Sequence, residues 1–220
     1  MADIRGAAVI VGAGPGLGAA LARAYGRAGH PVALVARSED RLAELGSTLQ
    51  AEGLEVGWAG LDVADAGGMT AAVQRFGEHR GGIAVVHHNA SRFRPGGLLE
   101  TDPEQLLADL AIGAVSMLAL VAAARPYLSA GGRVVATGSG AADRPFAGAG
   151  TLGVQKAALR TIATTLDSEL REGGVRAMSL TVRGTIAAGT PFDPDRIAAR
   201  VLELLAAPEE DWQTEVAYDG

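Results

Sequence analysis

The 220-residue chain carries 19 Lys and Arg residues against 25 Asp and Glu residues, which gives a formal net charge of −6. This balance lacks the basic excess that neutralises phosphate backbones or anionic lipid, so we expect neither nucleic acid nor a membrane surface as a partner. Hydrophobic residues make up 48% of the chain, enough to build one buried core, and the absence of cysteine excludes disulfides and thiolate metal sites.

The beginning of the chain, residues 1–5, leads into an apolar segment of only five residues, so we predict no signal peptide. No uninterrupted apolar run reaches the roughly 18 to 20 residues that span a bilayer, and we predict no transmembrane helix. No repeat or Pro/Ser-rich linker divides the chain. We therefore expect one domain over residues 1–220, located in the cytoplasm.

Short β-branched runs alternate with segments of helical periodicity along the whole chain. The expected strands cover residues 7–11, 32–36, 55–60, 83–87, 133–137, 175–181 and 214–218. Apolar residues between them recur at helical spacing, and the two longest expected helices cover about residues 102–128 and 151–171. This alternation predicts an α/β fold with a doubly wound, parallel, seven-stranded sheet and helices on both faces.

A glycine-rich segment connects the first expected strand to the first expected helix. A dinucleotide pyrophosphate needs a tight turn, a closely approaching backbone and the free N–H groups of a helix N-terminus, and this segment supplies all three. A merely tight turn is the alternative, because the chain has 31 glycines; the position after the first strand favours the cofactor. The candidate binding residues are Gly12, Gly14, Gly16, Leu17 and Gly18.

The end of the second expected strand favours one cofactor over another. An NAD enzyme places an Asp or Glu there for the ribose hydroxyls, whereas this chain has Ala36 and Arg37. A guanidinium pairs in bidentate fashion with the 2′-phosphate of NADP, so we predict NADP(H) in preference to NAD(H). Arg37 as a solvated residue at a helix start is the alternative. The missing carboxylate also disfavours a Rossmann-type methyltransferase.

Further matches in register give the chain a resemblance to the short-chain dehydrogenase/reductase family over essentially its whole length. The matching positions are the glycine loop, the pair that contacts adenine and an Asn-Ala pair: Gly12, Gly16, Gly18, Asp62, Val63, Asn89 and Ala90, with Ser91 where the family has Gly. The resemblance implies a Rossmann fold, nicotinamide cofactor chemistry on a small-molecule substrate, and a homodimer or homotetramer formed through the two long helices.

The resemblance also implies a catalytic set, of which this chain keeps only part. In the family a Ser orients the substrate carbonyl, a Tyr transfers the proton, and a Lys four residues after the Tyr binds the nicotinamide ribose and lowers the Tyr pKa. Ser139 and Lys156 match the Ser and the Lys, but Leu152 stands at the Tyr position. Lys156 is the only lysine in the chain, which favours a specific role over that of a solvated helix residue. Ser139 as an ordinary turn residue stays an alternative.

Three other departures from the family concern the surroundings of this set. Gly113 stands at the position of a relay Asn in the long helix, and Arg183 with Gly184 replaces a Pro-Gly pair. Residues 185–194 leave little length for a substrate lid, which predicts a shallow or open pocket. Arg183 is also a candidate ligand for an anion or a substrate carboxylate.

The missing Tyr leaves the proton donor open. The alternatives are Ser139 itself, Thr151, His88 and a water held by Lys156; His88 is equally well interpreted as a structural histidine. We expect an atypical NADP(H)-dependent oxidoreductase acting on a small carbonyl or alcohol, with no metal. A redox-silent NADP-binding sensor or regulator, and a non-redox enzyme that reuses the pocket, are the alternative functions.

Overall fold

The computed structural model describes residues 6–79 and 81–220. The prediction about a signal peptide concerns residues 1–5, which lie outside the described residues. The described residues form a seven-stranded parallel sheet of order β3-β2-β1-β4-β5-β6-β7. Its strands are β1 (Ala7–Val11), β2 (Val32–Ala36), β3 (Val56–Gly60), β4 (Ile83–His88), β5 (Leu128–Ser139), β6 (Arg176–Val182) and β7 (Glu215–Tyr218). All seven expected strands and the doubly wound parallel sheet are confirmed.

The central strands carry runs of buried apolar residues because helices cover both faces of the sheet. All five residues of β1 are buried, for example. β5 starts five residues earlier than the sequence predicts. Ile83 pairs with Leu128 before the register shifts, and Gly131 takes a φ of +92°, a conformation that glycine adopts without strain. The expected strand at residues 214–218 is confirmed as β7, which lies at the edge of the sheet.

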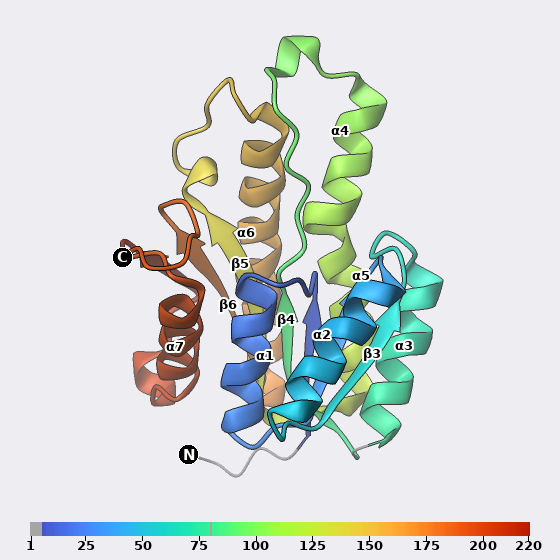
Figure 1. The fold of residues 1–220 in the computed structure, drawn as a ribbon. Helices are drawn as coiled ribbons and strands as arrows, with labels where there is room; N and C mark the ends of the chain where they lie inside the picture. The colour runs from blue at the N-terminus through green and yellow to red at the C-terminus, as the bar shows by residue number, and fades with distance from the viewer. Residues whose placement is uncertain (1–5, 80) are drawn as a thin grey trace.

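Two helical layers sandwich the sheet, as Figure 1 shows. The helices are α1 (Leu17–Arg27), α2 (Glu39–Ala51), α3 (Ala66–His79), α4 (Pro103–Leu110), α5 (Ser116–Ala124), α6 (Gly150–Leu170) and α7 (Pro194–Leu205). Buried residues of α1, α2 and α7 share one hydrophobic cluster with the sheet, and those of α3, α5 and α6 share the other. Each of these six helices therefore buries one apolar stripe against the sheet.

The predicted long helix of residues 102–128 exists with one irregularity. A π-helical segment, Ala111–Val115, joins α4 to α5, so the helical turn widens around Gly113. By length and composition the stretch Pro103–Tyr127 is apolar enough to cross a membrane, with a mean hydropathy of 2.2. Met117 and Leu120 of this stretch are nevertheless buried in the core against the sheet, as expected of a core helix in an α/β domain.

The parallel strands all end at one edge of the sheet, where the connecting loops gather at the top of Figure 1. The strand order reverses beside β1, because β2 lies on one side of β1 and β4 on the other. Ligands of doubly wound sheets bind outside the carboxyl ends of the strands at this switch point. The fold thus brings the glycine loop after β1 next to the segments that follow β4, β5 and β6.

Candidate active site

The glycine loop after β1 is shaped by contacts that only glycine allows. Gly12 has a φ of +86°, and a Cβ there would collide with the backbone of Ala90; a Cβ on Gly18 would press on Ala13. Space above Gly14 and Gly16 is open. The side chain of Asn89 donates a 3.0 Å hydrogen bond to the carbonyl oxygen of Gly12, which fixes the loop to the end of β4.

The N-terminus of α1 is free to receive an anion. Gly16 precedes the helix with no side-chain cap, and the first turn, which begins at Leu17, contains no acidic residue. The first N–H groups of a helix have no intrahelical partner and carry a partial positive charge. No atom lies within 4 Å of a Cβ built on Gly14 or Gly16, so the approach to these groups is open, and their binding of a dinucleotide pyrophosphate stays a prediction.

A cavity of about 550 Å³ lies between the glycine loop and the start of α2. Its lining includes Arg37 and Arg41, whose exposed guanidinium groups form no ion pair within residues 6–79 and 81–220. Glu39 accepts a 3.1 Å hydrogen bond from the indole nitrogen of Trp58 and does not line this cavity, whereas Glu44 does. Arg41 lies in the first turn of α2 and was not among the residues singled out from the sequence; its place four residues after Arg37 was the available signal.

Asp62 and Val63, the pair matched to adenine contact, follow β3 and do not line this cavity. Asp62 accepts a 3.0 Å hydrogen bond from the backbone N–H of Ala64, and Val63 is buried. The structure brings them to the same sheet edge as the glycine loop, and their contact with adenine stays a prediction.

A second cavity, of about 340 Å³, brings Ser139 and Lys156 together at the carboxyl ends of β4, β5 and β6. We call it the inner cavity. The Lys156 side chain is only 4% exposed, and its Nζ donates a 2.7 Å hydrogen bond to the carbonyl oxygen of Thr137. Burial lowers the pKa of Lys156 to about 8. The other lining residues are Leu17, Asn89, Ser91, Thr137, Gly138, Leu152, Val182, Gly184 and Ile186.

Ser139 is placed to donate a proton in a hydrogen bond. Its Oγ accepts a 3.2 Å hydrogen bond from the backbone N–H of Ala141, so its own hydroxyl hydrogen is free for a ligand. Ser139 therefore also caps the short turn that follows β5, and the turn role and the site role coexist.

Leu152 lines the inner cavity four residues before Lys156 on α6, and it also lines an adjoining cavity of about 830 Å³. No tyrosine lines either cavity. Tyr25 is buried on α1 and bonded to His87, Tyr127 contacts Glu78, and Tyr218 donates to the carbonyl oxygen of Pro191. The side chain that stands between the two cavities thus has no proton to transfer.

Two of the four alternative proton donors lie outside both cavities. His88 is fully buried, and its Nε2 lies 2.7 Å from Oγ of Ser116; burial lowers its pKa to about 3, which keeps the ring neutral. Thr151 is buried and lines neither cavity. Of the residues considered from the sequence as donors or as holding a donor water, Ser139 and Lys156 are the ones that line the inner cavity.

The 830 Å³ cavity, which we call the outer cavity, extends from Ser139 and Leu152 toward solvent. Arg183 lines it but is already paired, with Asp143 at 3.0 Å and with Asp219 at 3.5 Å. This pairing ties the short segment after β6 to the loop after β5. Arg183 therefore acts first as a structural cation, and its guanidinium is less available to a substrate carboxylate than the sequence suggests.

Comparisons with known proteins agree with this arrangement. Residues 6–191 match the sequence profile described as short chain dehydrogenase. An uncharacterized oxidoreductase of Staphylococcus epidermidis is 26% identical over 91% of each chain. A 2,5-dichloro-2,5-cyclohexadiene-1,4-diol dehydrogenase of Sphingobium indicum is 28% identical over 84% of this chain and 76% of its own length.

The fold has equally clear relatives of known structure. A short chain dehydrogenase from Burkholderia cenocepacia, crystallised in complex with NADP, superposes with a TM-score of 0.87 at 27% identity, covering 99% of this chain and 98% of that one. The profile match spans most of the chain, and the relatives cover it nearly from end to end. The chain belongs to the short chain dehydrogenase family of oxidoreductases.

Proposed function

We propose that the protein is an NADP(H)-dependent oxidoreductase that acts on a small carbonyl or alcohol without the tyrosine of its family. The observation that carries this proposal is the inner cavity, where Ser139 and the buried ammonium group of Lys156 meet beside Leu17 of the glycine loop. Lys156 has no carboxylate partner among the residues that the structure describes, and burying an unpaired ammonium group lowers the stability of the fold. A ligand whose hydroxyl groups accept hydrogen bonds from this ammonium would offset that cost.

Each part of the cofactor has matching groups on the chain. The free N–H groups at the start of α1 suit the pyrophosphate, Arg37 with Arg41 suits the 2′-phosphate, and Lys156 suits the ribose hydroxyls next to the nicotinamide. When bound, NADPH supplies a hydride to the substrate carbon. Ser139 would hold the carbonyl oxygen by donating its free hydroxyl hydrogen.

The proton for the substrate oxygen must come from a group other than residue 152. Lys156, with a pKa of about 8, holds an exchangeable proton near neutral pH and would pass it through a water between its Nζ and the substrate. General acid catalysis typically contributes about 10² to 10⁴ in rate, so we expect slower turnover than with a tyrosine in place.

The test is NADPH oxidation by the purified protein with a panel of small ketones, aldehydes and quinones. We expect slow turnover that Lys156→Ala abolishes, while Arg125→Ala, an exposed change remote from both cavities, leaves it unchanged. NADPH binding with no turnover on any carbonyl would contradict the reductase. Leu152 stands where the family has its proton-donating tyrosine. That result would therefore support the second candidate, a redox-silent NADP-binding protein.

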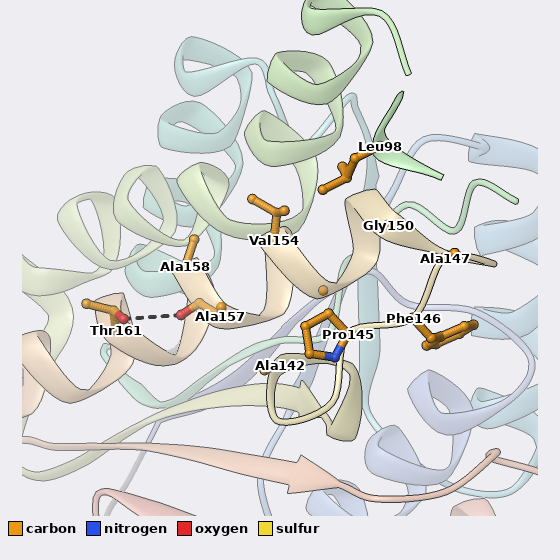
Figure 2. A pocket seen from close by; sticks show the side chains of 11 residues that line it. Leu98, Ala142, Pro145, Phe146, Ala147, Gly150, Val154, Ala157, Ala158 and Thr161 are labelled. Carbon is orange, nitrogen blue, oxygen red and sulfur yellow. Dashed lines mark hydrogen bonds between the residues drawn. The ribbon is translucent and has the colours of Figure 1, made fainter. Parts of the chain in front are cut away.

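We also propose that the protein forms a homodimer or homotetramer through the α4–α5 and α6 side. Leu107, Val115 and Leu118 leave apolar side chains exposed along the long helix. An apolar hollow of about 680 Å³ lies against α6, where Val154 and Leu98 border it (Figure 2). Exposed apolar side chains and an apolar hollow on the same helices are typical of a protein–protein interface.

A further inference from the structure

Gln155, the neighbour of Lys156 on α6, is completely buried and uses both ends of its amide. Its Oε1 accepts a 3.0 Å hydrogen bond from the backbone N–H of Arg92, and its Nε2 donates a 2.9 Å hydrogen bond to the carbonyl oxygen of the same residue. One side chain thus satisfies both backbone groups of one loop residue, as a neighbouring strand would.

The room for this amide exists because residue 113 has no side chain. A Cβ on Gly113 would collide with Oε1 of Gln155 and press on its Cδ and Cγ. Gly113 lies in the π-helical segment Ala111–Val115, which packs against α6. Gly113 and Gln155 are therefore a matched pair: the space that a side chain on the long helix would take is filled from α6 instead.

The clamped loop forms part of both cavities. Ser91, just before Arg92, lines the inner cavity, and Phe93, just after it, lines the outer cavity. Asn89 fastens the start of the same loop to Gly12. Arg94 holds the loop farther along through an ion pair with Asp109. The Gln155 clamp lies between these two attachments, and it fixes the part of the loop that carries Ser91 and Phe93 to the helix that carries Lys156.

We propose that Gln155 is a positioning residue that sets the wall formed by Ser91 and Phe93 relative to Lys156, and that Gly113 is glycine in order to admit it. The proposal rests on the proposed function for its kinetic consequence alone. Since Gln155 lines neither cavity, loss of the clamp should alter the fit of the carbonyl substrate and leave the binding of NADPH nearly unchanged.

Hydrogen exchange of peptides covering residues 89–95 tests the clamp without any substrate. In Gln155→Met, which keeps the volume and removes both hydrogen bonds, the Arg92 amide should exchange at least about tenfold faster than in the wild type. Gly113→Ala, which displaces the amide, should have the same local effect. In Gly113→Ala/Gln155→Ala the exchange should equal that of Gln155→Ala, because the added methyl group no longer meets the amide.

Kinetics give the second readout. With a carbonyl that the wild type reduces, Gln155→Met should raise KM about tenfold, with kcat and the NADPH Kd each changed less than about twofold. Unchanged exchange at residues 89–95, independent effects of Gly113→Ala and Gln155→Ala, or an NADPH Kd weakened as much as KM would overturn the proposal. A wild type that reduces no carbonyl would contradict the proposed function, and the exchange results would still decide the role of Gln155.

Discussion

The ammonium group of Lys156 donates a 2.7 Å hydrogen bond to the carbonyl oxygen of Thr137. Thr137 is itself held from the opposite face of the sheet, because its hydroxyl lies 2.9 Å from Nε2 of His87, whose Nδ1 lies 2.8 Å from the hydroxyl of Tyr25. A buried polar chain from α1 therefore fixes the acceptor of the only lysine in the protein. These hydrogen-bonded side chains hold Lys156 in place at the inner cavity before any ligand binds.

Burying Lys156 should cost stability in a pH-dependent way. Its pKa falls to about 8 in the folded protein from about 10.5 in the unfolded chain, so the unfolded state binds the proton more tightly. The penalty is complete below pH 8 and disappears as the pH rises through 10.5. From the size of the pKa shift, we expect the free energy of unfolding of Lys156→Met at pH 7 to exceed that of the wild type by about 3 kcal/mol at most. Loss of the hydrogen bond to Thr137 reduces this gain.

Urea unfolding of the wild type and Lys156→Met at pH 7 and at pH 10 measures this difference. The advantage of the variant should shrink at pH 10, where the folded wild type has lost the proton. An advantage that stays constant between the two pH values, or a variant less stable at pH 7, would show that the ammonium is not desolvated as the structure indicates.

Replacing Leu152 with tyrosine should restore a proton donor between the two cavities. Leu152 lines both, one helical turn before Lys156, so a phenol there would face the substrate oxygen and the ammonium group together. We expect Leu152→Tyr to raise kcat for carbonyl reduction by about 10² to 10⁴. Leu152→Phe is the matched control, since it adds the ring without the hydroxyl; equal rates for the two variants would contradict a missing donor.

His88 should make the fold sensitive to acid. Burial lowers its pKa to about 3, below the value of about 6.5 expected when unfolded, so the unfolded state binds more protons between these pH values. The contribution of neutral, buried His88 to the free energy of unfolding is fully present above pH 6.5 and is lost as the pH falls toward 3. Guanidinium unfolding at pH 7 and pH 5 should show a smaller loss for His88→Gln than for the wild type; equal losses would mean that His88 does not contribute.

An acidic residue on the exposed apolar face of α5 should disrupt self-association. Leu118 lies on the long helix together with exposed Val115, and a carboxylate buried there on association would lack a partner. Light scattering coupled to size exclusion should give a dimer or tetramer for the wild type and a monomer for Leu118→Asp. Ala188→Asp, in the segment after β6, serves as the control. A monomeric wild type would refute assembly.

Periodicity and spacing were sufficient to predict the sheet, because buried parallel strands read as apolar runs and each crossover helix has its own stripe. The glycine loop was located by its place between the first strand and the first helix, and Ser139 and Lys156 by the resemblance to the short-chain dehydrogenase/reductase family. These features are local in the sequence or separated by a fixed number of residues.

Contacts between distant segments could not be read from the sequence. The pairing of Arg183 with Asp143 and Asp219, the burial of His88 under the long helix, and the match of Gly113 with Gln155 all depend on how loops and helices pack. In the sequence, Gly113 indicates only that the relay Asn of the family is absent. The packing shows that Gly113 makes room for the side chain of Gln155.

The most direct test of the account is a titration with NADPH and, in parallel, NADH, following cofactor fluorescence at one fixed salt concentration. We predict that the wild type binds NADPH more tightly than NADH. Arg37→Ala should weaken NADPH binding about tenfold to a hundredfold and leave NADH binding unchanged. The control variant Arg125→Ala should bind both cofactors as the wild type does. Binding of neither cofactor, or equal binding of both that Arg37→Ala does not alter, would contradict an NADP(H) site and with it the proposed oxidoreductase.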